Sequence, residues 1–171
     1  HDLGGSDGLS LGIGEGGQGI GLERTAGEGD DKIKKRIPRN TLALWNLGFK
    51  DITTLLHDGR VTKSNIFGNG FNTPAQEALP KGLDNIVAVQ ALFPMTRQFE
   101  MAGNPGENEI IGLVSKVGKD SMRIDRVWPV ITHRIRGIPE YVELFKNAFD
   151  DVNSSLDINI THIVNSIAAF E

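Results

Sequence analysis

The chain contains no cysteine among its 171 residues. This absence excludes disulfide bonds, thiolate metal sites and cofactors linked through cysteine side chains of this chain. Long apolar runs are also missing, since none approaches the roughly 18 residues that would suggest a membrane-spanning helix. The net charge is −4, which does not suit a protein that binds nucleic acid through a basic surface. The composition is that of a soluble globular protein without a membrane span.

The length of 171 residues suits a single domain spanning the whole chain. The first residue is His1, no signal peptide is visible at this end, and the chain stops at Glu171 inside an apolar helical pattern. We therefore expect the sequence to be an internal or processed piece of a longer protein.

Glycine is abundant, with 21 residues, many of them within residues 1–36. We predict an ordered but irregular loop there, because glycine reaches backbone conformations that other residues cannot. Two overlapping G-x-G-x-x-G patterns begin at Gly12 and Gly14. A dinucleotide site needs a strand before such a pattern and a helix after it. Neither is expected here, so both patterns are interpreted as loop.

The remaining sequence predicts a mainly α-helical fold with long loops and no convincing strand. Apolar periodicity, proline positions and capping residues predict helices starting near residue 40 and over residues 51–56, 84–93, 108–118, 127–136, 139–149 and 159–170. Pro94 ends one of these helices, and Pro129 falls in the first turn of another. Residues 57–60 form a turn and residues 61–82 a loop. Trp128 is expected in the core or at a cofactor edge, and His133 and His162 at the surface or in packing.

The segment most suggestive of chemistry covers residues 90–110 and reads QALFPMTRQFEMAGNPGENEI. It places Gln90, Pro94 and the pair Glu100-Met101 between two apolar segments. An amide and a carboxylate on a loop beside apolar helices suit chemistry in a partly dry pocket. Composition alone, however, favours a solvated surface position for Glu100, because most glutamates are exposed.

Several segments, in this order, resemble the di-haem cytochrome c peroxidase family, which includes the methylamine-utilisation maturation enzyme. These segments are HDLGGSDGLSL, IPRNTLALWNLGF, LLHDGRV, QALFPMTRQFEMAGNPGENEI, IPEYVELFKNAF and ITHIVNSIAAFE. Taken in order, the first four resemble the sequence after the first haem-attachment motif, the PRN segment, the DGR turn and the catalytic loop. The last two resemble the two helices that close the first haem domain. The resemblance spans nearly the whole chain.

The resemblance implies a cytochrome-c-like domain, the first, peroxidatic haem domain of a longer two-haem protein. Because His1 stands at or beside the histidine of the haem-attachment motif, it is the candidate proximal ligand of the haem iron, and the attachment cysteines of haem c are expected outside this chain. By position, Glu100 matches the family's distal acid/base and Gln90 its distal amide. Pro94 and Met101 are carried over as residues that line the cofactor.

Two further residues are carried over by position. Asn40 matches the asparagine that helps to bind a calcium ion between the haem domains. His57 occupies the place where many members have a tryptophan between the two haems, and we expect it to lie beside the cofactor. An inserted segment also separates the DGR turn from Gln90. Electron transfer between the haems is therefore expected to follow a different route in this chain.

The expected function is the reduction of hydrogen peroxide by electrons from a second haem or a small redox protein, such as a cytochrome or a copper protein. A carboxylate above the iron can carry a proton from the near to the far peroxide oxygen, and an amide can hold the peroxide. The resemblance implies a periplasmic location and allows a homodimer. The alternative is a haem-less structural or docking fragment that retains the fold, which the lack of cysteine favours if the sequence is complete.

Overall fold

The computed structural model describes residues 29, 46–47, 49–97, 101–102, 110 and 124–171. The chain divides into two compact units. The first joins His1–Leu42 with Phe93–Ser121, and the second joins Ala43–Leu92 with Met122–Glu171. Most of the described residues belong to the second unit, which contains the sheet and the longer helices.

A small antiparallel sheet opens the second unit, with strand order β1-β2-β3. Its strands are β1 (Thr54–Leu55), β2 (Val61–Lys63) and β3 (Phe71–Asn72). Leu55 pairs with Val61, and Lys63 pairs with Phe71. Both members of the first pair are buried, at 6% and 0% exposure. The sheet therefore contributes this pair to the apolar core.

Helices make up most of the remaining described structure, which confirms the predicted mainly α fold class. The α-helices are α1 (Ile86–Ala91), α3 (Ile124–Arg136), α4 (Pro139–Ala148) and α5 (Ile160–Phe170). Short 3₁₀ helices are η2 (Gln76–Ala78), η3 (Pro94–Thr96) and η5 (Ser155–Asp157). Among the described residues, no helix has both the length and the apolar character needed to cross a membrane.

The prediction that the chain has no strands was wrong, as was the prediction of a helix over residues 51–56. Thr53 and Thr54 are β-branched and extended, and the Thr53 carbonyl accepts a hydrogen bond from the Lys63 N–H at 2.8 Å. Leu56 then adopts a left-handed conformation with φ of 66°. Strands of two or three residues are too short to show the alternation by which a strand is recognised in a sequence.

Helix positions were predicted better than helix ends. α1 is shorter than the predicted 84–93, and it ends before Pro94 as expected. α3 begins at Ile124 rather than at residue 127, so Pro129 lies inside the helix and not in its first turn. The predictions near residue 40 and over 108–118 fall outside the described residues, except for Ile110, which is helical and buried.

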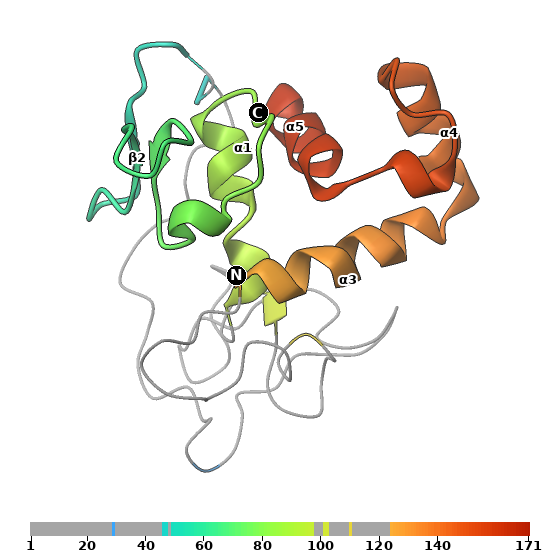
Figure 1. Ribbon diagram of the computed structural model, residues 1–171, viewed down its shortest axis with the longest axis horizontal. Coiled ribbons are helices and arrows are strands. Elements are labelled where there is room, and N and C mark those ends of the chain that lie inside the picture. Colours follow the sequence, from blue (N-terminus) through green and yellow to red (C-terminus); the bar gives the residue numbers. More distant parts are fainter. Residues whose placement is uncertain (1–28, 30–45, 48, 98–100, 103–109, 111–123) are drawn as a thin grey trace, which may run out of the picture. The chain divides into compact units, whose positions relative to one another are not determined.

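Helix α1 is the most deeply buried element of the second unit. Ile86, Val87, Ala88 and Val89 have exposures of 1% or less. The helix packs against α5 and against β1 and β2, and Figure 1 shows it between the sheet and α5. Isolated helices of this length do not form in water. The surrounding packing is therefore what makes residues 86–91 helical.

Asparagine side chains fix the beginning of α1. Asn85 caps the helix by accepting hydrogen bonds from the N–H groups of Val87 and Ala88, at 2.8 and 3.0 Å. Asn165 on α5 is 8% exposed. Its Oδ1 accepts from the Asp84 N–H at 3.1 Å, and its Nδ2 donates to the Gly82 carbonyl at 2.9 Å. One side chain of α5 thus holds the segment that leads into α1.

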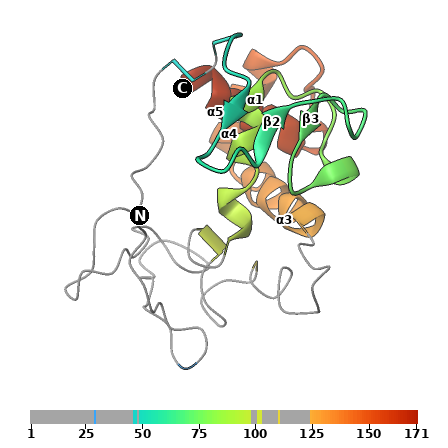
Figure 2. The ribbon, with the colours of Figure 1, turned by 90° about the vertical axis from the view of Figure 1, so that its left-hand side faces the viewer.

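A second apolar cluster joins α3, α4 and α5. Phe145, Val152, Ile158 and Ile163 are buried in it, and Ile135 and Phe149 are among the partly buried residues packed around it. Arg136, at the end of α3, donates from Nε to the Ile158 carbonyl at 2.8 Å and from Nη2 to the Leu156 carbonyl at 2.7 Å. The guanidinium therefore ties α3 to the loop that leads into α5. Figure 2 shows α3, α4 and α5 from another side.

The two helical histidines have the roles predicted for them, packing for one and surface for the other. His162 is 7% exposed, and its ring lies 4.8 Å from that of Phe149. Its Nδ1 accepts from the Asn159 N–H at 3.1 Å, and its Nε2 lies 3.2 Å from an Asp151 carboxylate oxygen. His133 is exposed on α3. Because both ring nitrogens of His162 have polar partners, this residue stabilises the beginning of α5.

Replacing Asn165 with leucine should lower the free energy of unfolding by about 2 kcal/mol, because two partly buried backbone groups lose their partner. Urea unfolding measures this change. The control is Ser166→Ala, at the next position, whose hydroxyl only donates to the His162 carbonyl. Ser166→Ala should lower the free energy of unfolding by less than about 0.5 kcal/mol. Equal stabilities of the two variants would contradict the role of Asn165.

The Asp157 carboxyl should titrate at a lower pH than an ordinary aspartate. Its pKa is lowered by hydrogen bonds from the Ser154 hydroxyl and N–H and from the Asn153 N–H. A lowered folded-state pKa stabilises the fold above about pH 4, and this contribution is lost as the pH falls through the folded pKa. Carboxyl NMR titration of Ser154→Ala should show the pKa rising. Ser155→Ala is the matched control and should leave it unchanged.

Candidate functional site

Gln90 lies in the last turn of α1 and is the only polar residue of this helix. Its side chain is half-buried. Within the described part of the chain, its amide makes no hydrogen bond to protein, whereas the backbone groups around it are paired. A partly buried amide usually has a partner. The assignment of Gln90 as the distal amide stays a prediction.

The end of α1 is held by the indole of Trp128. Trp128 is 4% exposed, and its Nε1–H donates to the Leu92 carbonyl at 3.1 Å. The burial confirms a core position, one of the two positions predicted for Trp128, and the cofactor edge stays a prediction. Sequence analysis did not identify the contact itself, because a tryptophan in an amphipathic helix pattern does not reveal its partner.

Pro94 and Met101 belong to the first unit. Pro94 opens η3 and is half-buried, and the following Met95 and Thr96 are both 4% exposed. Met101 is 56% exposed. The Ala102 N–H donates to the Arg97 carbonyl at 3.0 Å. Glu100 lies between Arg97 and Ala102 in the sequence, and it is outside the described residues.

His57 is exposed in the tight turn between β1 and β2. The Gly59 N–H closes this turn by donating to the Leu56 carbonyl at 3.1 Å. Both residues have φ of 66°, a conformation that is easy for glycine and costly for leucine. The strained Leu56 precedes His57 directly, so the turn fixes the backbone from which the imidazole projects.

The adjacent Asp58 and Arg60 form an ion pair that rigidifies the same turn. Nε of Arg60 donates to both carboxylate oxygens, at 3.0 and 2.8 Å, and Nη2 adds a further short contact. The Arg60 side chain holds the pKa of the Asp58 carboxyl well below its usual range. Asp58 is therefore charged at all ordinary pH values and faces the turn that carries His57.

The predicted site residues thus fall into three groups. Gln90 and His57 lie in the second unit, and Pro94 and Met101 lie in the first. His1, which was predicted to bind the iron, and Asn40, which was predicted to bind calcium, lie outside the described residues, as does Glu100. A common pocket for these residues stays a prediction.

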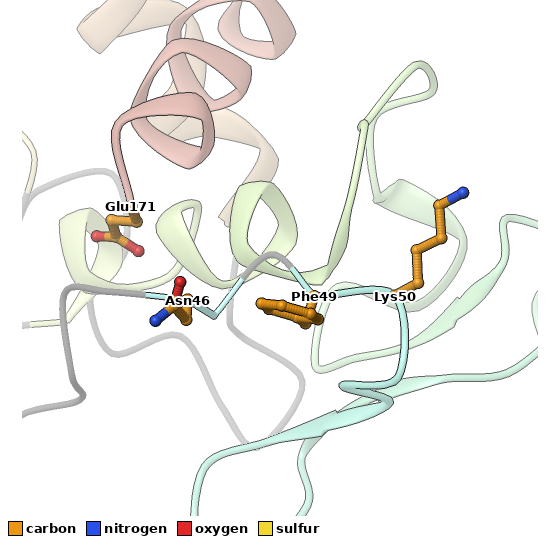
Figure 3. Close-up of a pocket in the computed structure, with 4 residues that line it drawn as sticks. All are labelled: Asn46, Phe49, Lys50 and Glu171. Atoms are coloured by element: carbon orange, nitrogen blue, oxygen red, sulfur yellow. The ribbon is translucent and has the colours of Figure 1, made fainter.

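A shallow cavity of about 410 Å³ lies elsewhere in the second unit, lined by Asn46, Phe49, Lys50 and Glu171. Figure 3 shows the Lys50 amine pointing away from the Glu171 carboxylate. Partial burial raises the pKa of the Glu171 carboxyl. None of the predicted site residues lines this cavity. The Lys50 amine and the Glu171 carboxylate that line it are not paired with each other in the described structure, so nothing here assigns a reaction to this cavity.

In the first unit, Pro94 and Met101 offer apolar side chains of the kind that suits a haem edge. In the second unit, the Gln90 amide offers a group that can hydrogen-bond. Thioether attachment would need cysteines, which these 171 residues lack. Among the described residues, no three His, Asp or Glu side chains are grouped closely enough to hold a metal ion.

Comparison with known proteins gives one match. The family model for the di-haem cytochrome c peroxidase matches residues 1–171. The searches of curated proteins and of solved structures found no match. The match covers the complete chain and includes Gln90, Pro94, Met101 and His57, so the family that the sequence resembles is confirmed. The chain belongs to the di-haem cytochrome c peroxidase family.

Proposed function

We propose that this chain is the peroxidatic haem domain of an enzyme that reduces hydrogen peroxide. The reaction takes two electrons and two protons and converts one peroxide into two waters. A bound haem supplies the redox-active iron. Family membership supports peroxidase-like haem chemistry in general. The observation that carries the proposal for this chain is the half-buried amide of Gln90, which has no protein partner in the described structure.

Gln90 holds the peroxide by hydrogen bonds in this proposal. A glutamine amide donates and accepts hydrogen bonds but takes no proton at neutral pH, so it orients the peroxide without competing for the transferred proton. The buried position of α1 supports this role, because a ligand-holding group works best on an element that does not move. Asn85 and Asn165 fix the start of the helix, and Trp128 fixes its end.

Glu100 moves the proton. Its carboxylate would take a proton from one peroxide oxygen and give it to the other, which leaves as water when the O–O bond breaks; the haem that the domain would hold would supply the electrons for this cleavage. The Ala102 N–H donates to the Arg97 carbonyl at 3.0 Å, and Glu100 lies between these two residues in the sequence. In this proposal Pro94 and Met101 would cover the cofactor.

The remaining assignments complete the proposed enzyme. His1 would hold the haem iron, and the oxygen atoms of Asn40 would help to hold a calcium ion. Electrons arrive from a second haem domain or from a small cytochrome or copper protein. The rigid turn at His57 lies on the electron route in place of the family's tryptophan. The enzyme works in the periplasm, alone or as a homodimer.

A haem-less structural or docking protein is the second candidate, which the absence of cysteine from the 171 residues favours only if they are the whole protein. We expect the purified natural protein to show the intense Soret absorption of haem and a mass that includes haem. A His1→Gly variant should change the spectrum, because it removes an axial ligand. A colourless protein of unmodified mass would establish the docking candidate instead.

Glu100→Gln should lower peroxide turnover by roughly 10²–10⁴-fold with haem content and fold unchanged, because the side chain keeps its size and loses the proton carrier. Gln90→Ala should be less harmful, because it removes only positioning. Stopped-flow or steady-state assays of the haem-loaded full-length protein measure both. Gln76→Ala, at an exposed glutamine of η2, is the control and should retain full activity. A Gln90→Ala variant that lost more activity than Glu100→Gln would refute the assignment of the acid/base.

A further inference from the structure

We propose that Trp128 is a positioning residue for Gln90. Its indole N–H fixes the Leu92 peptide at the end of α1, and this peptide sets the last turn of the helix, from which the Gln90 amide projects. The inference rests on the proposed function only for what Gln90 binds. The hydrogen bond from Trp128 to the end of α1 does not depend on the proposed function.

The Leu92 carbonyl needs a partner that α1 cannot supply. A helical carbonyl usually accepts from the N–H four residues later, which here belongs to Thr96. The Thr96 N–H instead donates to the Phe93 carbonyl at 2.9 Å, as part of η3. Leu92 is fully buried, so water does not replace the missing donor. Trp128 on α3 donates to this carbonyl at 3.1 Å.

The same peptide region also supports Gln90. The carbonyl of Gln90 would usually accept from residue 94, which is a proline without an N–H. The N–H of Leu92 donates to the carbonyls of Gln90 and Val89 in its place. Leu92 therefore joins two sets of contacts, with its N–H directed into α1 and its C=O directed to Trp128. Freeing its carbonyl would loosen the turn that carries Gln90.

Trp128 is suited to a fixed donor role. The indole has a single N–H and no acceptor, so it cannot exchange partners within this site. Its ring is buried, and the neighbouring Val127 is fully buried. The Thr132 hydroxyl donates to the Trp128 carbonyl at 2.9 Å, one turn further along α3. Thr132 offers a matched control, because its buried hydrogen bond lies on the same helix and does not involve α1.

The first test compares backbone amide hydrogen exchange in Trp128→Phe and Thr132→Val, in the full-length protein. Trp128→Phe keeps an aromatic ring and removes the donor. We expect exchange over residues 86–92 to become about tenfold faster in Trp128→Phe and to change less than about twofold in Thr132→Val. Similar exchange in the two variants would overturn the proposal. Should the smaller ring unfold the protein, an indole analogue with sulfur in place of N–H keeps the shape and takes the place of phenylalanine.

The second test is a double-mutant cycle on peroxide turnover by the haem-loaded protein. We expect Trp128→Phe to lower kcat/KM about fivefold in the natural background and less than about twofold in the Gln90→Ala background, because its effect passes through Gln90. An equal loss in both backgrounds would show general destabilisation and overturn the proposal. A protein without peroxide turnover would refute the proposed function, and the exchange comparison would then decide the role of Trp128 alone.

Discussion

The structure of the second unit depends on the burial of α1. This helix has only six residues, Ile86–Ala91, and it could not persist in water on its own. Its apolar residues pack against α5 and the sheet, and neighbouring side chains satisfy the polar backbone groups at both ends. Asn85 and Asn165 act at the beginning and Trp128 at the end. Each unpaired backbone group in such a buried place would cost about 1–3 kcal/mol.

Under the proposed function this arrangement matters, because the only polar side chain of α1 is Gln90. A hydrogen-bonding amide on a helix fixed at both ends keeps its orientation when a ligand arrives, and less entropy is lost on binding. Peroxide is a small ligand with few atoms to hold. Its orientation depends on the placement of single protein groups, and a helix between α5 and a sheet offers better placement than a free loop.

The turn at His57 shows a different way of fixing a side chain. Leu56 is held in a left-handed conformation, and the ion pair between Asp58 and Arg60 spans the same turn. Strained backbone persists where surrounding contacts overrule local preference, and it is frequent at functional positions. An exposed ion pair adds little to stability. Its contribution here is to fix the geometry around His57.

Periodicity, proline positions and the order of short motifs were sufficient to predict the mainly α fold, most helix positions and the family. These signals are local, because an apolar stripe or a proline acts on the chain beside it. The β-sheet was missed, because strands of two or three residues exist only through their partners. The start of α3 at Ile124 was missed for a similar reason, since helix ends depend on tertiary contacts.

For the candidate site, too, some features could be predicted from the sequence and others depended on the tertiary structure. Its residue types, an amide and a carboxylate around Pro94, were visible in the sequence through their resemblance to a family. The tertiary structure alone decided that the Gln90 amide has no protein partner within the described residues, and that Trp128 and Asn165 hold its helix. These contacts join residues far apart in the chain, Trp128 to Leu92 and Asn165 to Gly82. No local pattern encodes such pairs, because each depends on how the helices pack.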